Sequence, residues 1–324
     1  MAQKNKVGII GGAGYTGGET LRLLLNHPEV ELLFVHSRSN AGKPLHVLHT
    51  DLLGETSLHF TDTVQEADVL FLCLGHGESK KFLQENAIPN STKLIDLSQD
   101  FRLGENYEGS AFVYGLPELN REEIKKARAI ANPGCFATAI QLGLLPLAKA
   151  GILGEVFTTG ITGSTGAGQK LQDTTHFSWR ANNISAYKTL SHQHLSEIKQ
   201  SLRQLQLNFD KAINFIPWRG DFARGIFVSS CLSSALSLEE IIKLYKDFYH
   251  DHPFTQVSDT PIHLKQVVNT NKCFLHIEKE GDKIVIHSVI DNLLKGAAGQ
   301  AVQNMNLFMG LGETSGLRLK SIAF

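Results

Sequence analysis

The alternation of short apolar runs with amphipathic segments over residues 1–135 is the feature that most limits what this chain can fold into. Apolar runs of strand length occur at residues 6–11, 30–37, 67–75 and 92–98. Helical patterns lie between them at residues 16–28, ending at Pro28, and at residues 78–87. Strands that alternate with helices build a parallel sheet with helices on both faces, so we predict an α/β, doubly wound, Rossmann-type domain.

The pattern changes after Cys135, where the strand-like segments become longer. They cover residues 155–168, 209–220, 225–236 and 272–291, the last with a hairpin turn at 280–283. Helical patterns follow at 195–207 and 237–253, and a final one at 296–311 has small residues on one side. We therefore predict a second, α+β domain over residues 135–295. The first domain is expected to comprise residues 1–134 and 296–324, with the last helix returning to it.

Composition excludes several classes of protein. The 324 residues leave room for about two domains, and 42% hydrophobic with 19% charged residues is typical of a globular protein. A net charge of −1 provides no basic excess for nucleic acid or a membrane surface. The N-terminus shows no apolar leader, and no run of about 18 apolar residues appears. We expect a cytoplasmic protein with no nucleic-acid or membrane partner.

A glycine-rich turn joins the first strand to the first helix. Gly11, Gly14 and Gly17 are spaced GxxGxxG, with Tyr15 and Thr16 between the last two. Small residues at the start of a helix allow backbone N–H groups to approach a pyrophosphate, which the helix dipole also favours. The alternative is a tight strand–helix turn that binds nothing.

The end of the second strand bears on which nucleotide would bind. NAD sites usually place a carboxylate there, whereas this chain has Ser37, Arg38 and Ser39, with Lys43 further on. Hydroxyl and guanidinium groups can bind a 2′-phosphate that a carboxylate would repel. We therefore predict NADP(H) as cofactor; the alternative is a solvated loop with an incidental arginine.

The four cysteines fall into two groups. Cys73, Cys231 and Cys273 lie in strand-like runs and are expected to be core residues. Cys135 follows Asn132-Pro133-Gly134 and precedes a helical pattern, so its thiol would lie at a helix N-terminus, where the dipole favours thiolate. No pair of cysteines forms a CxxC motif, which indicates a reducing compartment. Spacing alone leaves Cys135 open between a nucleophile and a buried cap.

A nucleophilic thiol needs a base, and the candidates are His192 and His194 in the segment SHQHLSEI. They lie two residues apart, directly before a predicted helix. The alternative is that both histidines are exposed polar residues before a helix cap, because the sequence pattern is the same in that case. A zinc site is less favoured because no third ligand has matching spacing, and we expect no metal.

Several segments together resemble a known family. They are GIIGGAGYTGGE, HSRSNAGK, LIDLSQDFRL, YGLPELN, NPGC, GSTGAGQ, SHQHLSEI and DNLLKGAAGQAVQNMN. In this order, over almost the whole chain, they resemble the N-acetyl-γ-glutamyl-phosphate reductase family of arginine biosynthesis. Aspartate-semialdehyde dehydrogenase is a more distant relative with the same plan.

The resemblance implies an NADP-binding Rossmann domain and a substrate and dimerisation domain similar to that of glyceraldehyde-3-phosphate dehydrogenase. It implies NADPH-dependent reduction of an acyl phosphate to a semialdehyde through a cysteine thioester, by a homodimer or homotetramer. Cys135 matches the nucleophile and His192 the acid/base, with His194 and Glu197 completing the motif. Substrate contacts are expected at Arg102, Asn132 and Arg224. Cofactor contacts are expected at Ser164, Gly166, Gly168 and Asn292.

Two departures from the family pattern stand out. Ala137 precedes Thr138 where the family usually has proline, which should leave the nucleophile intact. Trp218 and Arg219 replace the middle of the motif that ends at Arg224-Gly225. A second arginine there could bind the extra carboxylate of an N-succinyl group in place of N-acetyl; the alternative is a solvent-exposed side chain.

Three other functions are compatible with this set of motifs. Two are enzymes, N-acetylaminoadipyl-phosphate reductase and aspartate-semialdehyde dehydrogenase, and the His-x-His motif disfavours the latter. The third is a catalytically inactive NADP-binding sensor, which the presence of both Cys135 and His192 disfavours.

Overall fold

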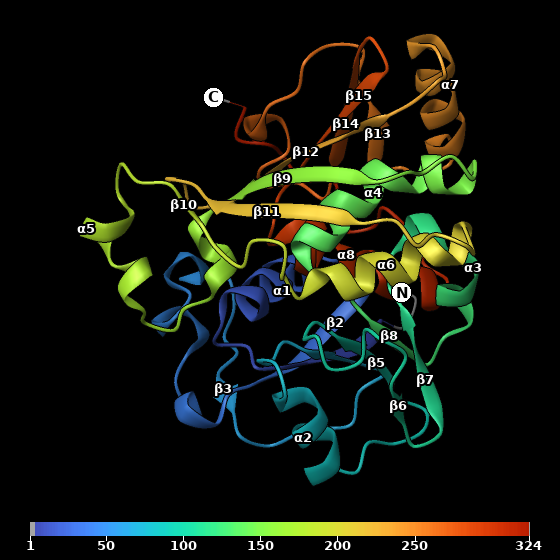
Figure 1. Cartoon of the computed structure of the whole chain (residues 1–324). Helices are drawn as coiled ribbons and strands as arrows, with labels where there is room; N and C mark the ends of the chain where they lie inside the picture. Colours follow the sequence, from blue (N-terminus) through green and yellow to red (C-terminus); the bar gives the residue numbers. More distant parts are fainter. Residues whose placement is uncertain (1–3, 324) are drawn as a thin grey trace. The chain divides into compact units, whose positions relative to one another are not determined.

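The structure, a computed structural model, describes residues 4–323 and divides into two compact units (Figure 1). The first unit comprises the chain up to Pro133 together with Ala297–Arg318. The second comprises Gly134–Gly296 and the chain from Leu319 onward. The domain limits expected from the sequence stay a prediction. They differ from these units mainly in the tail from Leu319, which the sequence analysis assigns to the first domain.

The first unit is built on an eight-stranded sheet with the order β3-β2-β1-β4-β5-β8-β7-β6. Its strands are β1 (Asn5–Ile10), β2 (Val30–His36), β3 (Phe60–Thr61), β4 (Val69–Leu72), β5 (Lys93–Asp96), β6 (Asn106–Tyr107), β7 (Ser110–Tyr114) and β8 (Ala129–Ala131). All neighbours are parallel except the β6–β7 hairpin. Its helices are α1 (Tyr15–Leu25), α2 (Glu78–Glu85), α3 (Pro117–Lys126) and α8 (Gly299–Phe308).

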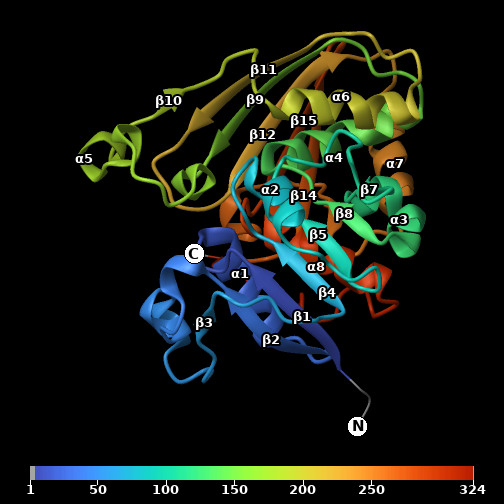
Figure 2. The ribbon, with the colours of Figure 1, turned by 90° about the horizontal axis from the view of Figure 1, so that it is seen from below.

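Helices cover both faces of this sheet, which confirms the doubly wound prediction. Figures 1 and 2 show α2 on one face and α1 with α8 on the other, and α8 contacts both α1 and α3. The central strand β4 is apolar throughout and all four of its residues are buried, as expected for a strand that is covered on both faces.

Two local predictions for the first unit need correction. The helix expected over residues 16–28 ends at Leu25, where Asn26 caps it. Cys73 lies just past the end of β4 and not within a strand. Its sulfur is 3.6 Å from the Thr20 hydroxyl, and burial raises the pKa of the thiol to about 12, so this cysteine is a packing residue.

The second unit is built on a seven-stranded mixed sheet with the order β10-β11-β9-β12-β15-β14-β13. Its strands are β9 (Val156–Thr162), β10 (Ser185–Ala186), β11 (Ile213–Arg219), β12 (Ile226–Ser233), β13 (Thr255–Val257), β14 (Cys273–Glu280) and β15 (Lys283–Ile290). Its helices are α4 (Cys135–Lys149), α5 (Phe177–Arg180), α6 (His194–Leu205) and α7 (Leu238–Tyr249). The predicted hairpin at 280–283 is confirmed, since Glu280 pairs with Lys283 across the turn.

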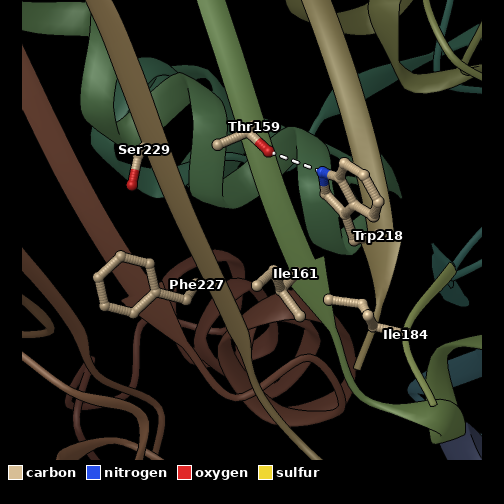
Figure 3. Close-up of a pocket in the computed structure, with 6 residues that line it drawn as sticks. All are labelled: Thr159, Ile161, Ile184, Trp218, Phe227 and Ser229. Carbon is tan, nitrogen blue, oxygen red and sulfur yellow. Dashed lines mark hydrogen bonds between the residues drawn. The ribbon is translucent and has the colours of Figure 1, made fainter. Parts of the chain in front are cut away.

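One face of this sheet carries helices and the other is open. Helix α4 packs on β12 and β15 and contacts α6 and α7. On the opposite face, side chains of β9, β11 and β12 line a mostly apolar pocket (Figure 3). Trp218 lies there, with its indole N–H donating to the Thr159 hydroxyl at 2.9 Å. Cys231, expected in the core, is half-buried on β12.

The part of the chain that the structure describes has neither a membrane-spanning helix nor a cluster of metal ligands. No helix in residues 4–323 has both the length and the apolar character needed to cross a bilayer. Within the same residues, no three His, Cys, Asp or Glu side chains gather as a metal site would require.

Candidate active site

Cys135 is the first residue of α4, as the sequence predicted. Gly134 is the N-cap, with extended backbone angles, and its carbonyl accepts a hydrogen bond from the Thr138 N–H at 2.8 Å. The thiol of Cys135 is half-buried. At this position the unsatisfied N–H groups of the first turn and the helix dipole stabilise a thiolate. Ala137, where the family usually has proline, is fully buried in the same turn.

The backbone just before the thiol is packed by two predicted site residues. The Gly134 N–H donates to Glu197 Oε2 at 3.1 Å. The ring of His194 lies so close that a β-carbon added to Gly134 would be 2.3 Å from His194 Nε2. His194 Nε2 in turn lies 3.9 Å from Glu197 Oε1. His194 and Glu197 therefore position the cap of α4.

Gly296 also contacts the candidate nucleophile, and the sequence did not reveal it. A β-carbon on Gly296 would lie 2.8 Å from Cys135 Cβ. Its N–H donates to the Asp291 carbonyl at 2.9 Å. The run KGAAG held this glycine, but nothing in the run indicated that it would pack against a residue 161 positions earlier (296 − 135).

His192 lies in an aromatic enclosure. Its ring makes edge contacts with Phe136, Tyr187 and Phe215, and only 4% of the residue is exposed. Nδ1 accepts the His194 backbone N–H at 3.3 Å, so the neutral ring carries its proton on Nε2. Burial, and then the charge of Lys188, lowers the pKa of His192 to about 4. At neutral pH the residue is therefore an uncharged hydrogen-bond donor.

Tyr187 joins this enclosure to the departure at Arg219. The guanidinium carbon of Arg219 lies 4.6 Å from the centre of the Tyr187 ring. Burial raises the pKa of the Tyr187 phenol, and the negative charge of a Cys135 thiolate raises it further. Tyr187 thus contacts both Arg219 and His192, and the sequence did not reveal it because it belongs to no motif.

Arg224 and Asn292 form hydrogen bonds to other residues of the second unit. Arg224 forms two hydrogen bonds of 3.1 Å to the buried carboxylate of Asp291. The Asn292 side chain accepts the Gly225 N–H at 2.7 Å and donates to Thr165 Oγ1 at 3.0 Å.

Thr165 belongs to a short helical turn, Ser164–Ala167, which Gly168 ends. The predicted cofactor residues Ser164, Gly166 and Gly168 lie in this turn. The Ser164 N–H donates to the Phe222 carbonyl at 2.9 Å, and Gly168 has a φ of 76°. The structure brings these three residues together with Asn292, and their cofactor role stays a prediction.

In the first unit, the three glycines of the turn serve different purposes. Gly11 has a φ of 83°, and a β-carbon there would lie 2.5 Å from the Cys73 carbonyl oxygen. A β-carbon on Gly17 would lie 2.5 Å from the Gly11 oxygen. Gly14, by contrast, has nothing within 4 Å of that position. A tight first glycine, an open second and a packed third are what a dinucleotide turn needs.

The candidate 2′-phosphate residues follow β2. Ser37 is buried, and its hydroxyl accepts from Asn40 at 3.1 Å. Arg38 is exposed and forms an ion pair with Glu85 at 3.2 Å. An exposed pair of this kind contributes little free energy, so a phosphate could compete for Arg38. The residues fit an NADP site.

Arg102, where a substrate contact is predicted, is buried and bound to main-chain carbonyls. It is 6% exposed; its Nε donates to the Asn132 carbonyl at 2.8 Å and its Nη2 to the Leu97 carbonyl at 3.2 Å. The Asn132 side chain donates to the Ala297 carbonyl at 3.1 Å. Both residues brace the segment that leads to Pro133, and their contact with substrate stays a prediction.

Comparison with known families matches each unit to a different domain. Residues 6–127 match the semialdehyde dehydrogenase NAD binding domain, and residues 135–292 match the semialdehyde dehydrogenase dimerisation domain. The N-acetyl-gamma-glutamyl-phosphate reductase of Bacteroides thetaiotaomicron is 58% identical, over 98% of this chain and 99% of its own. That of Christiangramia forsetii is also 58% identical, over 98% of each chain.

Solved structures show the same fold at much lower identity. Aspartate semialdehyde dehydrogenase II of Vibrio cholerae superposes with a TM-score of 0.75 and 17% identity, covering 95% of this chain and 99% of that one. A probable aspartate-semialdehyde dehydrogenase of Pseudomonas aeruginosa gives a TM-score of 0.73, also at 17% identity, over 95% and 99% of the two chains. The Rossmann-like domain and the mixed-sheet domain are thus both confirmed.

Proposed function

Because this chain belongs to the N-acetyl-gamma-glutamyl-phosphate reductase family, we propose that it reduces an N-acyl-γ-glutamyl phosphate to N-acyl-glutamate 5-semialdehyde in arginine biosynthesis. The observation that carries the proposal is the thiol of Cys135 at the start of α4, with Glu197 and His194 packed against its cap. This arrangement supplies a nucleophile for acyl transfer and donors for the charge that develops.

The first step is acyl transfer to the thiol. The Cys135 thiolate attacks the γ-carbonyl carbon, a C–S bond forms, and the bond to the phosphate oxygen breaks, which releases phosphate. A thioester accepts hydride more readily than an oxygen ester, so a cysteine suits this step better than a serine. N–H groups in the first turn of α4 would stabilise the oxyanion of the tetrahedral intermediate.

His192 acts as a hydrogen-bond donor in the second step. Reduction of the thioester leaves a thiohemiacetal alkoxide on Cys135, which collapses to the aldehyde as the thiolate departs. Neither event consumes a proton, so a neutral imidazole that donates from Nε2 suffices to stabilise the alkoxide. The lowered pKa of His192 favours this role over transfer of a full proton.

We propose NADP(H) as the cofactor, which supplies the hydride when bound. Gly11, Gly14 and Gly17 would hold the pyrophosphate at the start of α1, and Ser37 with Arg38 the 2′-phosphate. Support comes from the open space at Gly14 and from the lack of a carboxylate directly after β2.

We propose further that the N-acyl group is succinyl. Arg219 is half-buried and stacks on Tyr187, and Trp218, its neighbour on β11, points to the open face instead. A guanidinium so placed matches an added carboxylate. The proposal is tested by comparing kcat/KM for N-succinyl- and N-acetyl-glutamate 5-semialdehyde. An equal or higher value for the acetyl compound contradicts it.

The open face of the second sheet supports assembly as a homodimer or homotetramer. The match to a dimerisation domain covers this sheet, and Phe227, Ile161 and Trp218 form an apolar surface on it. Light scattering on the purified protein tests the proposal. A Phe227→Asp variant should shift the mass toward the monomer, and a monomeric wild type contradicts it.

The reaction itself is tested in reverse. With an N-acyl-glutamate 5-semialdehyde, NADP and inorganic phosphate, the protein should reduce NADP only when phosphate is present. Absence of turnover with acetyl, succinyl and aminoadipyl substrates alike would contradict the proposed function and favour the inactive sensor.

A further inference from the structure

An arginine that no motif singled out is buried within a mostly exposed segment of the second unit, residues 169–185. Arg180 ends the short helix α5, beside β10 at the edge of the sheet (Figures 1 and 2). Phe177, at the start of that helix, is 80% exposed, whereas Arg180 is only 8% exposed. Its Nη1 donates to the Gly220 carbonyl at 3.2 Å and its Nη2 to the Ser185 hydroxyl at 3.4 Å, while Nε is buried with no partner.

These contacts place Arg180 beside Arg219. Gly220 follows Arg219 in the chain, and Ser185 is the strand partner of Arg219 in the β10–β11 pair. The Arg219 guanidinium donates to Thr174 Oγ1 at 3.1 Å. Burial lowers the pKa of Arg180, and the charge of Arg219 lowers it further. Two like charges therefore share one partly enclosed corner, defined by Arg180 and Arg219.

No carboxylate among residues 4–323 forms an ion pair with either arginine. Asp221 is the acidic residue that favours the charge of Arg180, and its Oδ2 accepts the Asn182 N–H at 2.7 Å. A buried guanidinium without a directly paired carboxylate costs free energy, and a second guanidinium beside it adds to that cost. Planar, forked donors of this type match a carboxylate in a bidentate manner.

Tyr187 connects this corner to the reaction. Arg219 stacks on its ring, and the same ring makes an edge contact with His192, which also packs on Phe136, the neighbour of Cys135 in α4. The phosphate of the proposed substrate is bonded to the carbon that Cys135 attacks, so it cannot lie a whole aromatic ring away. The substrate carboxylates, several bonds from that carbon, can.

We propose that Arg180 and Arg219 form a two-guanidinium subsite that binds a carboxylate of the substrate. This inference rests on the proposed function and extends it, since it assigns Arg180 to substrate binding and names the group that it binds. The α-carboxylate of the glutamyl unit and the terminal carboxylate of a succinyl group share this chemistry. The experiment distinguishes them.

The binding experiment needs no turnover. Calorimetric titration of the full chain with N-acetylglutamate and with N-succinylglutamate measures the affinity of each stable carboxylate ligand. Arg180→Gln should weaken binding about 10- to 100-fold, as expected for loss of charge-assisted hydrogen bonds. Arg180→Lys keeps the positive charge but not the forked donor geometry of a guanidinium, so it should lose less affinity than Arg180→Gln. Arg203→Gln is the control, because that arginine also donates to a main-chain carbonyl in the same unit.

The pattern of losses identifies the carboxylate. A loss for N-succinylglutamate alone assigns the succinyl carboxylate, and equal losses for both ligands assign the α-carboxylate; either result supports the subsite. Wild-type affinity for both ligands in a folded Arg180→Gln or Arg180→Lys protein would overturn it. Thermal melting establishes that the variants are folded.

Steady-state kinetics supply a second readout. In the reverse assay Arg180→Gln should raise the KM for semialdehyde about 10- to 100-fold and change kcat only a few-fold. The KM for inorganic phosphate should stay unchanged, and a rise in that KM with normal carboxylate binding would overturn the proposal. If no acyl substrate turns over at all, the proposed function fails while the titrations still decide on the subsite.

Discussion

Helices α1 and α4 begin in the same way and differ in what surrounds the first residue. Each has a glycine N-cap with extended angles and no side-chain cap. In each, the glycine carbonyl accepts the N–H four residues on, at 2.8 Å from Gly18 to Gly14 and from Thr138 to Gly134. Each therefore presents unsatisfied N–H groups and a positive dipole end.

The surroundings separate the two. Nothing lies within 4 Å of a β-carbon added to Gly14, whereas one added to Gly134 would strike the ring of His194. The start of α1 is open, as a site for a large ligand must be. The start of α4 is closed by the protein's own side chains around a thiol. In the proposed function, the same arrangement of backbone groups therefore serves ligand binding in one unit and covalent chemistry in the other.

The largest expected effect comes from removing the thiol. Cys135→Ser should lower kcat by more than about 1,000-fold, because an alkoxide does not form at neutral pH and an oxygen ester resists hydride. NADPH binding, measured by fluorescence titration, should stay within about twofold of wild type. Turnover near the wild-type rate would contradict the role of Cys135.

Closing the small space at Gly134 should have the next largest effect. In Gly134→Ala the new methyl group must displace His194, since the two cannot lie 2.3 Å apart. We expect kcat/KM to fall about 100-fold and the melting temperature to drop by several degrees. The φ of Gly134 is an ordinary −70°, so backbone strain is not the cause. A fully active variant would show that the packing of His194 against the cap is dispensable.

The matching change at the other helix should act on cofactor binding alone. Gly14→Ala meets no neighbour and should cost at most about 1 kcal/mol of stability. It should raise the NADPH dissociation constant about 30-fold, because the methyl group occupies the space that the pyrophosphate needs. Gly312→Ala is the control, since a β-carbon there also meets nothing. Equal NADPH affinity in both variants would refute a pyrophosphate at Gly14.

Local sequence patterns were enough to predict the start of α1. For α4 they predicted the position of Cys135 but not the residues that pack around it. The strand, the glycines and the helix of the first turn are contiguous in the sequence, so their arrangement could be predicted. Cys135 could likewise be placed at a helix start from Pro133, Gly134 and the apolar period. The neighbours His194 and Gly296 could not, because only the tertiary fold brings segments 60 and 161 residues away to the cap (194 − 134 and 296 − 135).

The short strands β8 and β10 could not be predicted from the sequence either, because they too depend on residues distant in the chain. Strand β8 has three residues, Ala129–Ala131, and exists because β5 and β7 pair with it on both sides. Strand β10 has two residues, and its pairing with β11 brings Arg180 toward Arg219. Pairing of this kind depends on neighbours and leaves no periodic trace in so short a segment.

A smaller effect is expected at the phosphate end of the α1 site. Arg38→Ala should raise the NADPH dissociation constant about tenfold and leave that of NADH within about twofold, since only NADPH carries the 2′-phosphate. Glu85→Gln removes the carboxylate paired with Arg38 and should tighten NADPH slightly. Equal losses for the two cofactors in Arg38→Ala would rule out the 2′-phosphate role.

The smallest expected effect is a pair of opposed pH dependences, one in each unit. In the second unit, the pKa of His192 is lowered to about 4, so folding favours its neutral form. That stability is present above pH 6.5 and is lost as pH falls toward 4. In the first unit, burial raises the pKa of Asp96 to about 6, although its hydrogen bonds to Ser98 oppose the shift. That stability is present below pH 4 and is lost as pH rises through 6.

Between pH 6 and pH 5 the two contributions nearly cancel, each changing by about 1 kcal/mol with opposite sign. The free energy of unfolding of His192→Asn should therefore rise as the pH falls from 6 to 5, whereas that of the wild type should stay nearly constant. Asp96→Asn should become less stable over the same interval. Urea unfolding at the two pH values measures both. A flat slope in Asp96→Asn would show that the pKa of His192 is ordinary, and a flat slope in His192→Asn would show the same for Asp96.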